Sequence, residues 1–144
     1  MSTILNLNMS RDPAAVRQLS PATLAFVGDA AYGLCVREQL AQEVRKSGEL
    51  HRLSVCFVKA AAQAQACQTI RPFLTEEEEA VFKRGRNFHP NHSPKSATAQ
   101  DYHLATGLET LFGYLYLSGN NERLSFLFSQ IWEEIQDKIP SQEG

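Results

Sequence analysis

The chain has 144 residues, of which 43% are hydrophobic and 21% charged, and its formal net charge is −2. This length fits one domain with a hydrophobic core. The charge excludes a protein that attracts nucleic acid through a uniformly basic surface, so a nucleic-acid binder of this composition needs its basic residues gathered in one place. No apolar run reaches the roughly 18 residues of a membrane span. The N-terminal MSTILNLNMSRDP lacks the basic start and long apolar run of a secretory signal, so we expect a cytoplasmic protein.

The three cysteines, Cys35, Cys56 and Cys67, are an odd number and form no C-x-x-C pair. Each lies in an apolar or alanine-rich run. This pattern predicts buried free thiols in a reducing compartment rather than disulfides.

The first predicted helix begins at Ser20-Pro21, where a serine N-cap precedes a proline in the first turn. Its apolar stripe recurs at helical spacing through Leu24, Val27, Ala31, Leu34 and Cys35. A second helix is expected over about 49–70, which includes the helix-favouring KAAAQAQACQ.

A third helix is expected over 75–83, because Thr75 and Glu78 make a capping box and Gly85 suits a helix end. Residues 85–98 hold two prolines and no periodicity, which is typical of a loop. A fourth helix follows over about 100–117, and SGNN at 118–121 separates it from a last helix over about 122–138. We therefore predict a single all-α domain over 1–144, with no strands, linker or repeat.

One acidic residue, Asp29, stands in the otherwise uncharged stretch LAFVGDAAYGL at 24–34. At about 100° per residue, Asp29 lies opposite the predicted apolar stripe. The residues on its own side are mostly small or aromatic: Ala25, Phe26, Tyr32, Gly33 and Val36. A face of this kind suits close approach by another helix, another subunit or a ligand.

Glu109 has a matching setting in the helix over 100–117. The stripe opposite it consists of Leu104, Leu108, Leu111 and Leu115, and its own side carries small and aromatic residues. Two such carboxylates can hold Mg²⁺, which needs few protein ligands because it keeps waters and binds substrate phosphates. The alternative is that each acid pairs with a lysine or arginine, or caps a helix.

Residues 80–100 contain no acid and carry a compact cationic group. Its members are Lys83, Arg84, Arg86 and Lys95. A phosphate backbone is the expected partner, although Lys83 and Arg84 could simply complement a helix C-terminus. The pair His89 and His92 suggests zinc only weakly, because no cysteine or second histidine pair accompanies it.

These segments resemble a known family. LAFVGDAAYGL resembles the signature helix of the ribonuclease III family, whose core reads Leu-Glu-Phe-Leu-Gly-Asp, and TGLETLFGYLYL resembles its second motif. FLTEEEEAVFKRGRN, the nearby SPK and LFGYLYL resemble segments of the Mini-III subfamily. The resemblance runs from about Ser20 to Trp132, so the motif-bearing part of the predicted domain is about 20–138.

The resemblance implies an all-helical homodimer that holds double-stranded RNA in a valley, with one metal-dependent cleavage centre per protomer. The Mini-III subfamily lacks the separate double-stranded-RNA-binding domain, and we expect none in this protein. By motif match, Asp29 and Glu109 are the catalytic and metal-binding residues. The family pattern has a glutamate at Ala25 and an aspartate at Thr106, so the number of metal ions per site stays open.

The implied activity is that of a Mg²⁺-dependent endoribonuclease, for which Mn²⁺ can substitute, that hydrolyses duplex RNA to leave 5′-phosphate ends. The implied substrate is the base-paired end of precursor 23S ribosomal RNA, presented with help from a large-subunit ribosomal protein. Two alternatives remain at this stage. The chain could be a non-catalytic dimeric RNA-binding protein of the same fold, or a helical protein-interaction module.

Overall fold

The computed structural model describes residues 11–43, 45–88 and 98–139. Lys95, His89 and His92 lie outside these ranges. All regular structure within them is helical, which confirms the predicted fold class. The helices are α1 (Pro13–Arg17), α2 (Pro21–Ala41), α3 (Ser47–Val58), α4 (Ala60–Ile70), η1 (Arg71–Phe73), α5 (Glu76–Arg86), α6 (Ala99–Leu117), α7 (Asn121–Ile135) and η2 (Gln136–Lys138).

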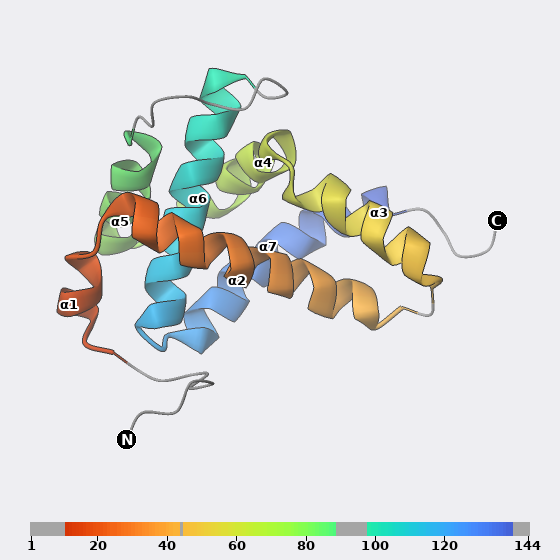
Figure 1. Cartoon of the computed structure of the whole chain (residues 1–144), viewed down its shortest axis with the longest axis horizontal. Coiled ribbons are helices and arrows are strands. Elements are labelled where there is room, and N and C mark those ends of the chain that lie inside the picture. The colour runs from red at the N-terminus through yellow and green to blue at the C-terminus, as the bar shows by residue number, and fades with distance from the viewer. Residues whose placement is uncertain (1–10, 44, 89–97, 140–144) are drawn as a thin grey trace.

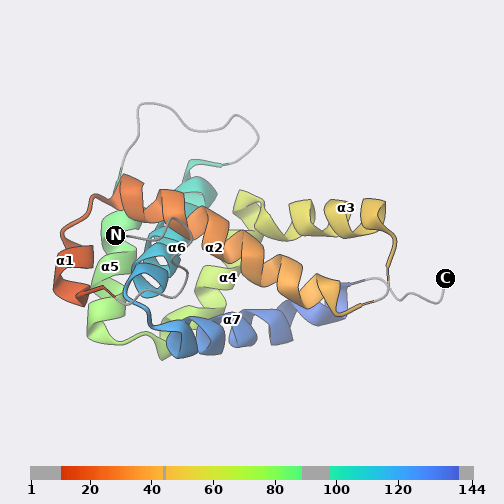
Figure 2. The same ribbon diagram turned by 60° about the horizontal axis from the view of Figure 1, so that its bottom comes forward.

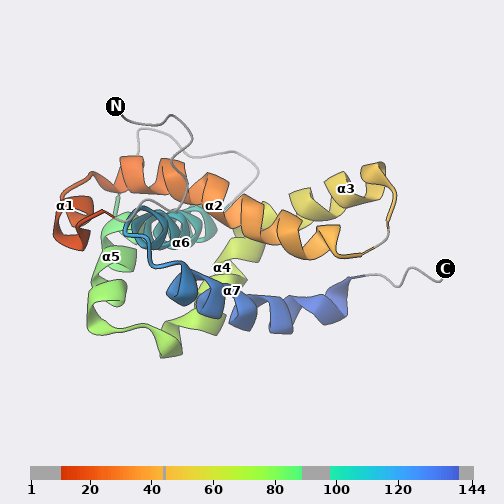
Figure 3. The same ribbon diagram turned by 90° about the horizontal axis from the view of Figure 1, so that it is seen from below.

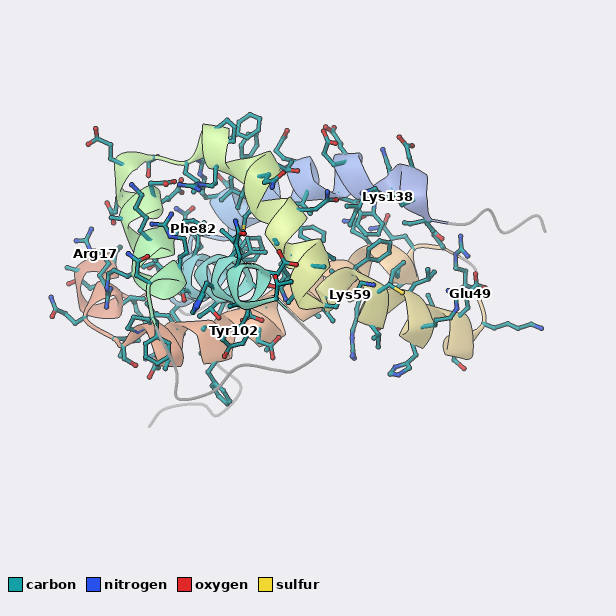
Figure 4. The ribbon with its side chains drawn as sticks, turned by 90° about the horizontal axis from the view of Figure 1, so that it is seen from above. Arg17, Glu49, Lys59, Phe82, Tyr102 and Lys138 are labelled. Carbon is teal, nitrogen blue, oxygen red and sulfur yellow. The ribbon has the colours of Figure 1, made fainter. Side chains whose placement is uncertain are left out.

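Helix α6 forms the centre of the molecule. It contacts α1, α2, α4, α5 and α7, and Figure 1 shows α2 crossing in front of it. Seen end-on in Figure 4, α6 is enclosed by its neighbours, with Phe82 of α5 directed toward it. Between Ala105 and Leu115 every residue except Glu109 is buried. A helix surrounded in this way needs apolar or small residues on all sides, so the single leucine stripe predicted from the sequence was too narrow.

Helix α2 buries a row of residues spaced by four. The row consists of Leu24, Gly28, Tyr32, Val36 and Leu40, and Ala31 lies beside it. The predicted stripe was therefore partly wrong: Leu34 is 56% exposed and Val27 only half-buried. The physical reason is that α2 packs on α6 near its start and on α3 farther along, as Figure 2 shows, so one straight stripe does not describe its contacts.

The helix predicted over 49–70 is interrupted at Lys59, which has extended backbone angles (φ −69°, ψ 158°) and separates α3 from α4. Gln63 donates a hydrogen bond from Nε2 to the backbone oxygen of Val58, at 2.8 Å, which satisfies one of the open carbonyls at the end of α3. The sequence VKAAAQ contains no glycine or proline, so local chemistry did not predict this break.

The capping box at Thr75 and Glu78 is confirmed, but Gly85 does not end α5. The helix continues to Arg86, and Gly85 is buried against α6. A Cβ at Gly85 would lie 2.2 Å from Oγ1 of Thr110, so glycine is required there for packing and not for helix termination. Helix α1, which was not predicted, begins with Asp12 and Pro13, the same capping pattern as Ser20-Pro21.

Figure 3 shows α2 and α7 on opposite sides of the molecule. Their side chains meet where Tyr32 contacts Phe128 edge-to-face.

The cysteines are free as predicted, but Cys56 is exposed on α3, so the prediction of a buried thiol was wrong there. In the part of the chain that the structure describes, no helix has the length and apolarity to cross a membrane.

Candidate active site

Two glycines bring the main chains of α2 and α6 into contact. A Cβ at Gly28 would lie 1.6 Å from the backbone oxygen of Glu109, and one at Gly113 would lie 1.9 Å from that of Leu24. Neither position has room for a side chain. The element in contact is α6, and it lies on the Leu24–Gly28 side of the helix. On the face predicted for close approach, Asp29 and Phe26 are exposed and Gly33 has open space around it, so the structure does not confirm close packing there.

The crossing places Asp29, next to Gly28, beside the side chain of Glu109. Their carboxyl groups come close enough to share a hydrogen bond. Asp29 is exposed and Glu109 is half-buried, so the pair lies at the edge of the helix crossing with one side open to solvent. The structure thus brings together the two acids that were identified separately in the sequence.

The surroundings of Glu109 oppose its ionisation. Burial, the negative charge of Asp29 and the hydrogen bond with Asp29 raise the pKa of the Glu109 carboxyl to about 8, and the hydrogen bond from Gln63 partly offsets this. Two carboxylates at this separation repel each other unless a proton or a cation lies between them. A divalent cation would remove that repulsion, so the pair is suited to metal binding.

Within residues 11–43, 45–88 and 98–139, neither acid forms an ion pair with a basic side chain. The alternative of a structural ion pair therefore finds no support in these ranges. No third histidine, cysteine or acidic residue of the described chain joins the two to complete a larger metal-binding group. Thr106 is buried and donates its hydroxyl to the backbone oxygen of Tyr102, and Ala25 has no ligating atom in its side chain.

The chain matches the ribonuclease III domain family over residues 22–120. It belongs to that family. Among curated relatives, a Mini-ribonuclease 3 of Clostridium tetani is 44% identical over 76% of this chain and 74% of its own length. A Mini-ribonuclease 3 of Brevibacillus brevis is 43% identical over 89% and 94%, respectively.

A crystal structure of a protein from Fusobacterium nucleatum has the same fold, with a TM-score of 0.74 at 29% identity. The match covers 86% of this chain and 98% of that one. Together the matches identify the chain as an endoribonuclease of the ribonuclease III type. Membership of the family implies double-stranded RNA as the substrate class and a divalent metal ion as the cofactor class. The two non-enzymatic alternatives are thereby disfavoured.

The basic residues of this ribonuclease III domain end α5 and differ in what they contact. Lys83 has a half-exposed side chain whose only described ion pair is a long one, 3.9 Å to Glu79. Arg84 donates to the backbone oxygens of Arg17 and Leu19, which ties α5 to the end of α1. Arg86 is half-buried and lies over the ring of Phe82. All three are in the last turn, where a positive charge also complements the helix dipole.

Gln63 is the residue near the carboxylate pair that sequence reasoning missed. It is buried on α4, and its Nε2 lies 3.4 Å from Oε2 of Glu109. Its position in an alanine- and glutamine-rich run looked like ordinary helix-favouring composition. Only the packing of α4 against α6 distinguishes it from the exposed glutamines nearby.

Proposed function

We propose that this chain is a Mg²⁺-dependent endoribonuclease that cuts double-stranded RNA, with Asp29 and Glu109 as its catalytic, metal-binding residues. The observation that carries the proposal is the meeting of these two acids at the glycine crossing of α2 and α6. A carboxylate pair without a basic partner destabilises a fold unless a ligand uses it. In a family of nucleases, that ligand is the metal ion.

The two acids fit a hard cation such as Mg²⁺, for which Mn²⁺ substitutes, because carboxylate oxygens are its preferred protein ligands. When bound, the ion polarises the scissile phosphate and makes water a stronger nucleophile. Asp29 and Glu109 hold this charge at one fixed place beside the RNA. The cleavage that we propose leaves 5′-phosphate ends.

Lys83, Arg84, Arg86 and Lys95 are proposed to bind the RNA backbone. Lys83 and Arg84 are exposed, and Arg86 is half-buried. Arg84 uses two of its five N–H groups on the backbone oxygens of Arg17 and Leu19, which leaves the others available for a phosphate. The major groove of A-form RNA is too deep and narrow for side chains to read its base edges, so recognition rests on phosphates, 2′-hydroxyls and shape.

A homodimer is the assembly that we propose, formed through the outer face of α2. Phe26 is 82% exposed there, and Leu34 of the same helix is also exposed. Gly33 lies between them in sequence with open space around it, which suits close packing of a second copy. Two centres facing one duplex would cut both strands.

The proposed substrate is the base-paired end of precursor 23S ribosomal RNA, presented with a large-subunit ribosomal protein in the cytoplasm. This part of the proposal is supported by the similarity to Mini-ribonuclease 3 proteins. The catalytic unit is taken as one domain over 1–144, with its motifs between 20 and 138.

The test is cleavage of a base-paired precursor stem with and without Mg²⁺. Asp29→Asn and Glu109→Gln should each lower the cleavage rate on the order of 10²–10³-fold, as removal of a group that stabilises charge in the transition state typically does. Glu76→Gln, an exposed change on α5, is the control and should cut as the wild type does. If both site variants retain the wild-type rate, the proposal is wrong.

A further inference from the structure

Gln63 is 3% exposed, and its side-chain amide is held in one orientation. Nε2 donates to the backbone oxygen of Val58 at 2.8 Å and faces Oε2 of Glu109 at 3.4 Å. A backbone carbonyl only accepts hydrogen bonds, so the contact with Val58 identifies the nitrogen end of the amide. The amide nitrogen therefore points toward Val58 and Glu109, and the amide oxygen points away from them.

That oxygen, Oε1 of Gln63, is buried and has no hydrogen-bond partner among the described residues. A buried oxygen in this condition is rare in native proteins and signals a water or an ion that completes the site. It belongs to the amide that contacts Glu109, so it lies within a few ångströms of the carboxylate pair. The Nε2 of Gln63 thus contacts Glu109, a proposed metal ligand, while its Oε1 can still accept a hydrogen bond.

The need for such a residue follows from the composition of the centre. Where the family pattern has four carboxylates, this chain has Ala25 and Thr106 in place of two. The Thr106 hydroxyl is already used on the backbone of its own helix. With fewer protein side chains at the centre, the orientation of Glu109 depends more on the other groups that contact it.

We propose that Gln63 is a positioning residue of the cleavage centre. Its amide, anchored on the backbone oxygen of Val58 at the end of α3, holds the Glu109 carboxylate through Nε2 and offers Oε1 to a water near that carboxylate. Lys59, labelled in Figure 4, marks the junction of α3 and α4, and Gln63 lies in the first turn of α4 after it. The inference rests on the proposed function, since it assumes that Asp29 and Glu109 hold the metal ion.

The competing explanation is purely structural. Gln63 could serve only to satisfy the carbonyl of Val58 where α3 ends. That role predicts that removal of the amide lowers stability and leaves metal affinity unchanged. The positioning role predicts a loss of metal affinity in protein that is still folded.

The experiment is calorimetric titration of Mn²⁺ into the full chain without RNA, for the wild type, Gln63→Met and Gln68→Met. Methionine keeps the length of glutamine and removes both polar atoms, and Gln68 is an exposed glutamine of the same helix. We expect Gln63→Met to weaken Mn²⁺ binding about 10–100-fold, the usual effect of removing a group that orients a metal ligand. The Mn²⁺ concentration for half-maximal cleavage should rise by a similar factor, and Gln68→Met should match the wild type.

A folded Gln63→Met protein that binds Mn²⁺ within twofold of the wild type would overturn the inference. If that variant does not fold, the side-chain amide resonance of Gln63 in ¹⁵N-glutamine-labelled wild type replaces it. The resonance should move on Mg²⁺ addition in the wild type and stay still in Glu109→Gln, and a resonance that ignores saturating Mg²⁺ in both overturns the inference. Asp29→Asn separates the two proposals. If it binds metal and cleaves normally, the proposed function fails; if it loses both while Gln63→Met keeps both, only the role of Gln63 fails.

Discussion

Two glutamates, Glu78 and Glu109, are both enclosed by the fold, and their surroundings are opposite. Glu78 accepts two hydrogen bonds of 2.8 Å from the guanidinium of Arg123 and one of 2.9 Å from the backbone of Thr75. Glu109 faces another acid and an amide. One carboxylate is fully compensated, and the other is not.

The pKa values follow these surroundings. Burial alone would raise the pKa of Glu78, but the hydrogen bonds from Arg123 and Thr75 outweigh it and hold the pKa below the ordinary glutamate value. For Glu109 burial and Asp29 act in the same direction, and the pKa is raised. A compensated acid therefore stabilises the fold, whereas an uncompensated pair of acids lowers its stability until a ligand binds.

The largest expected change in stability concerns Glu78, the compensated acid. Glu78→Gln leaves Arg123 without its carboxylate and weakens the cap of α5, so the free energy of unfolding should fall by about 3 kcal/mol, as when one partner of an enclosed ion pair is removed. Urea unfolding at neutral pH measures this change. Glu76→Gln, in the same turn but exposed, should cost less than about 1 kcal/mol. If both variants lose the same free energy of unfolding, Glu78 contributes no more to stability than the exposed Glu76.

The next largest change concerns the uncompensated pair, Asp29 and Glu109. Mg²⁺ at about 100 times its dissociation constant should stabilise the wild type by about 2.7 kcal/mol, because it binds the folded state and not the unfolded chain. Unfolding by urea with and without the ion measures this. Asp29→Asn should show no such gain. An equal gain in that variant would place the metal elsewhere.

One added methyl group at Gly28, where α2 contacts the main chain of α6, should lower the stability of the fold. Gly28→Ala would drive a Cβ into the main chain of α6, so we expect a loss of about 1–3 kcal/mol from overpacking. Cleavage should fall as well, because the two carboxylates move apart with their helices. Gly48→Ala, a helical glycine of α3 with open space around it, is the matched control and should not destabilise. Unfolding curves that show equal stability for both variants would contradict the close contact.

The smallest effect is the pH dependence of stability without metal. Folded Glu109 holds its proton more tightly than the unfolded chain does, so the folded state binds more protons and stability falls as pH rises from about 5 to about 8. Glu109→Gln should lack this part of the slope and be relatively more stable at the upper end. The urea midpoint in the presence of a chelator, measured across this range, tests the sign. Parallel slopes for the two proteins would mean that Glu109 ionises normally.

Much of this could be predicted from the sequence because the signals were local. Capping residues marked the starts of α2 and α5, and a single acid in each of two uncharged helix segments pointed to the candidate site. The face that α2 buries could not be predicted, because the direction in which α6 crosses it decides whether Leu34 or Tyr32 enters the core. The same holds for Gln63 and Arg84. Each forms its decisive contact with a part of the chain far away or across a helix break, and no local pattern encodes that contact.

The contact of Gly28 and Gly113 also bears on how this protein can change over generations. Main-chain atoms, not side-chain rotamers, set how closely the helices that carry Asp29 and Glu109 approach. Core residues elsewhere can vary in size and shape without re-aiming the pair. Sequence drift in the rest of the core is therefore compatible with an unchanged centre, while these two positions admit no residue but glycine.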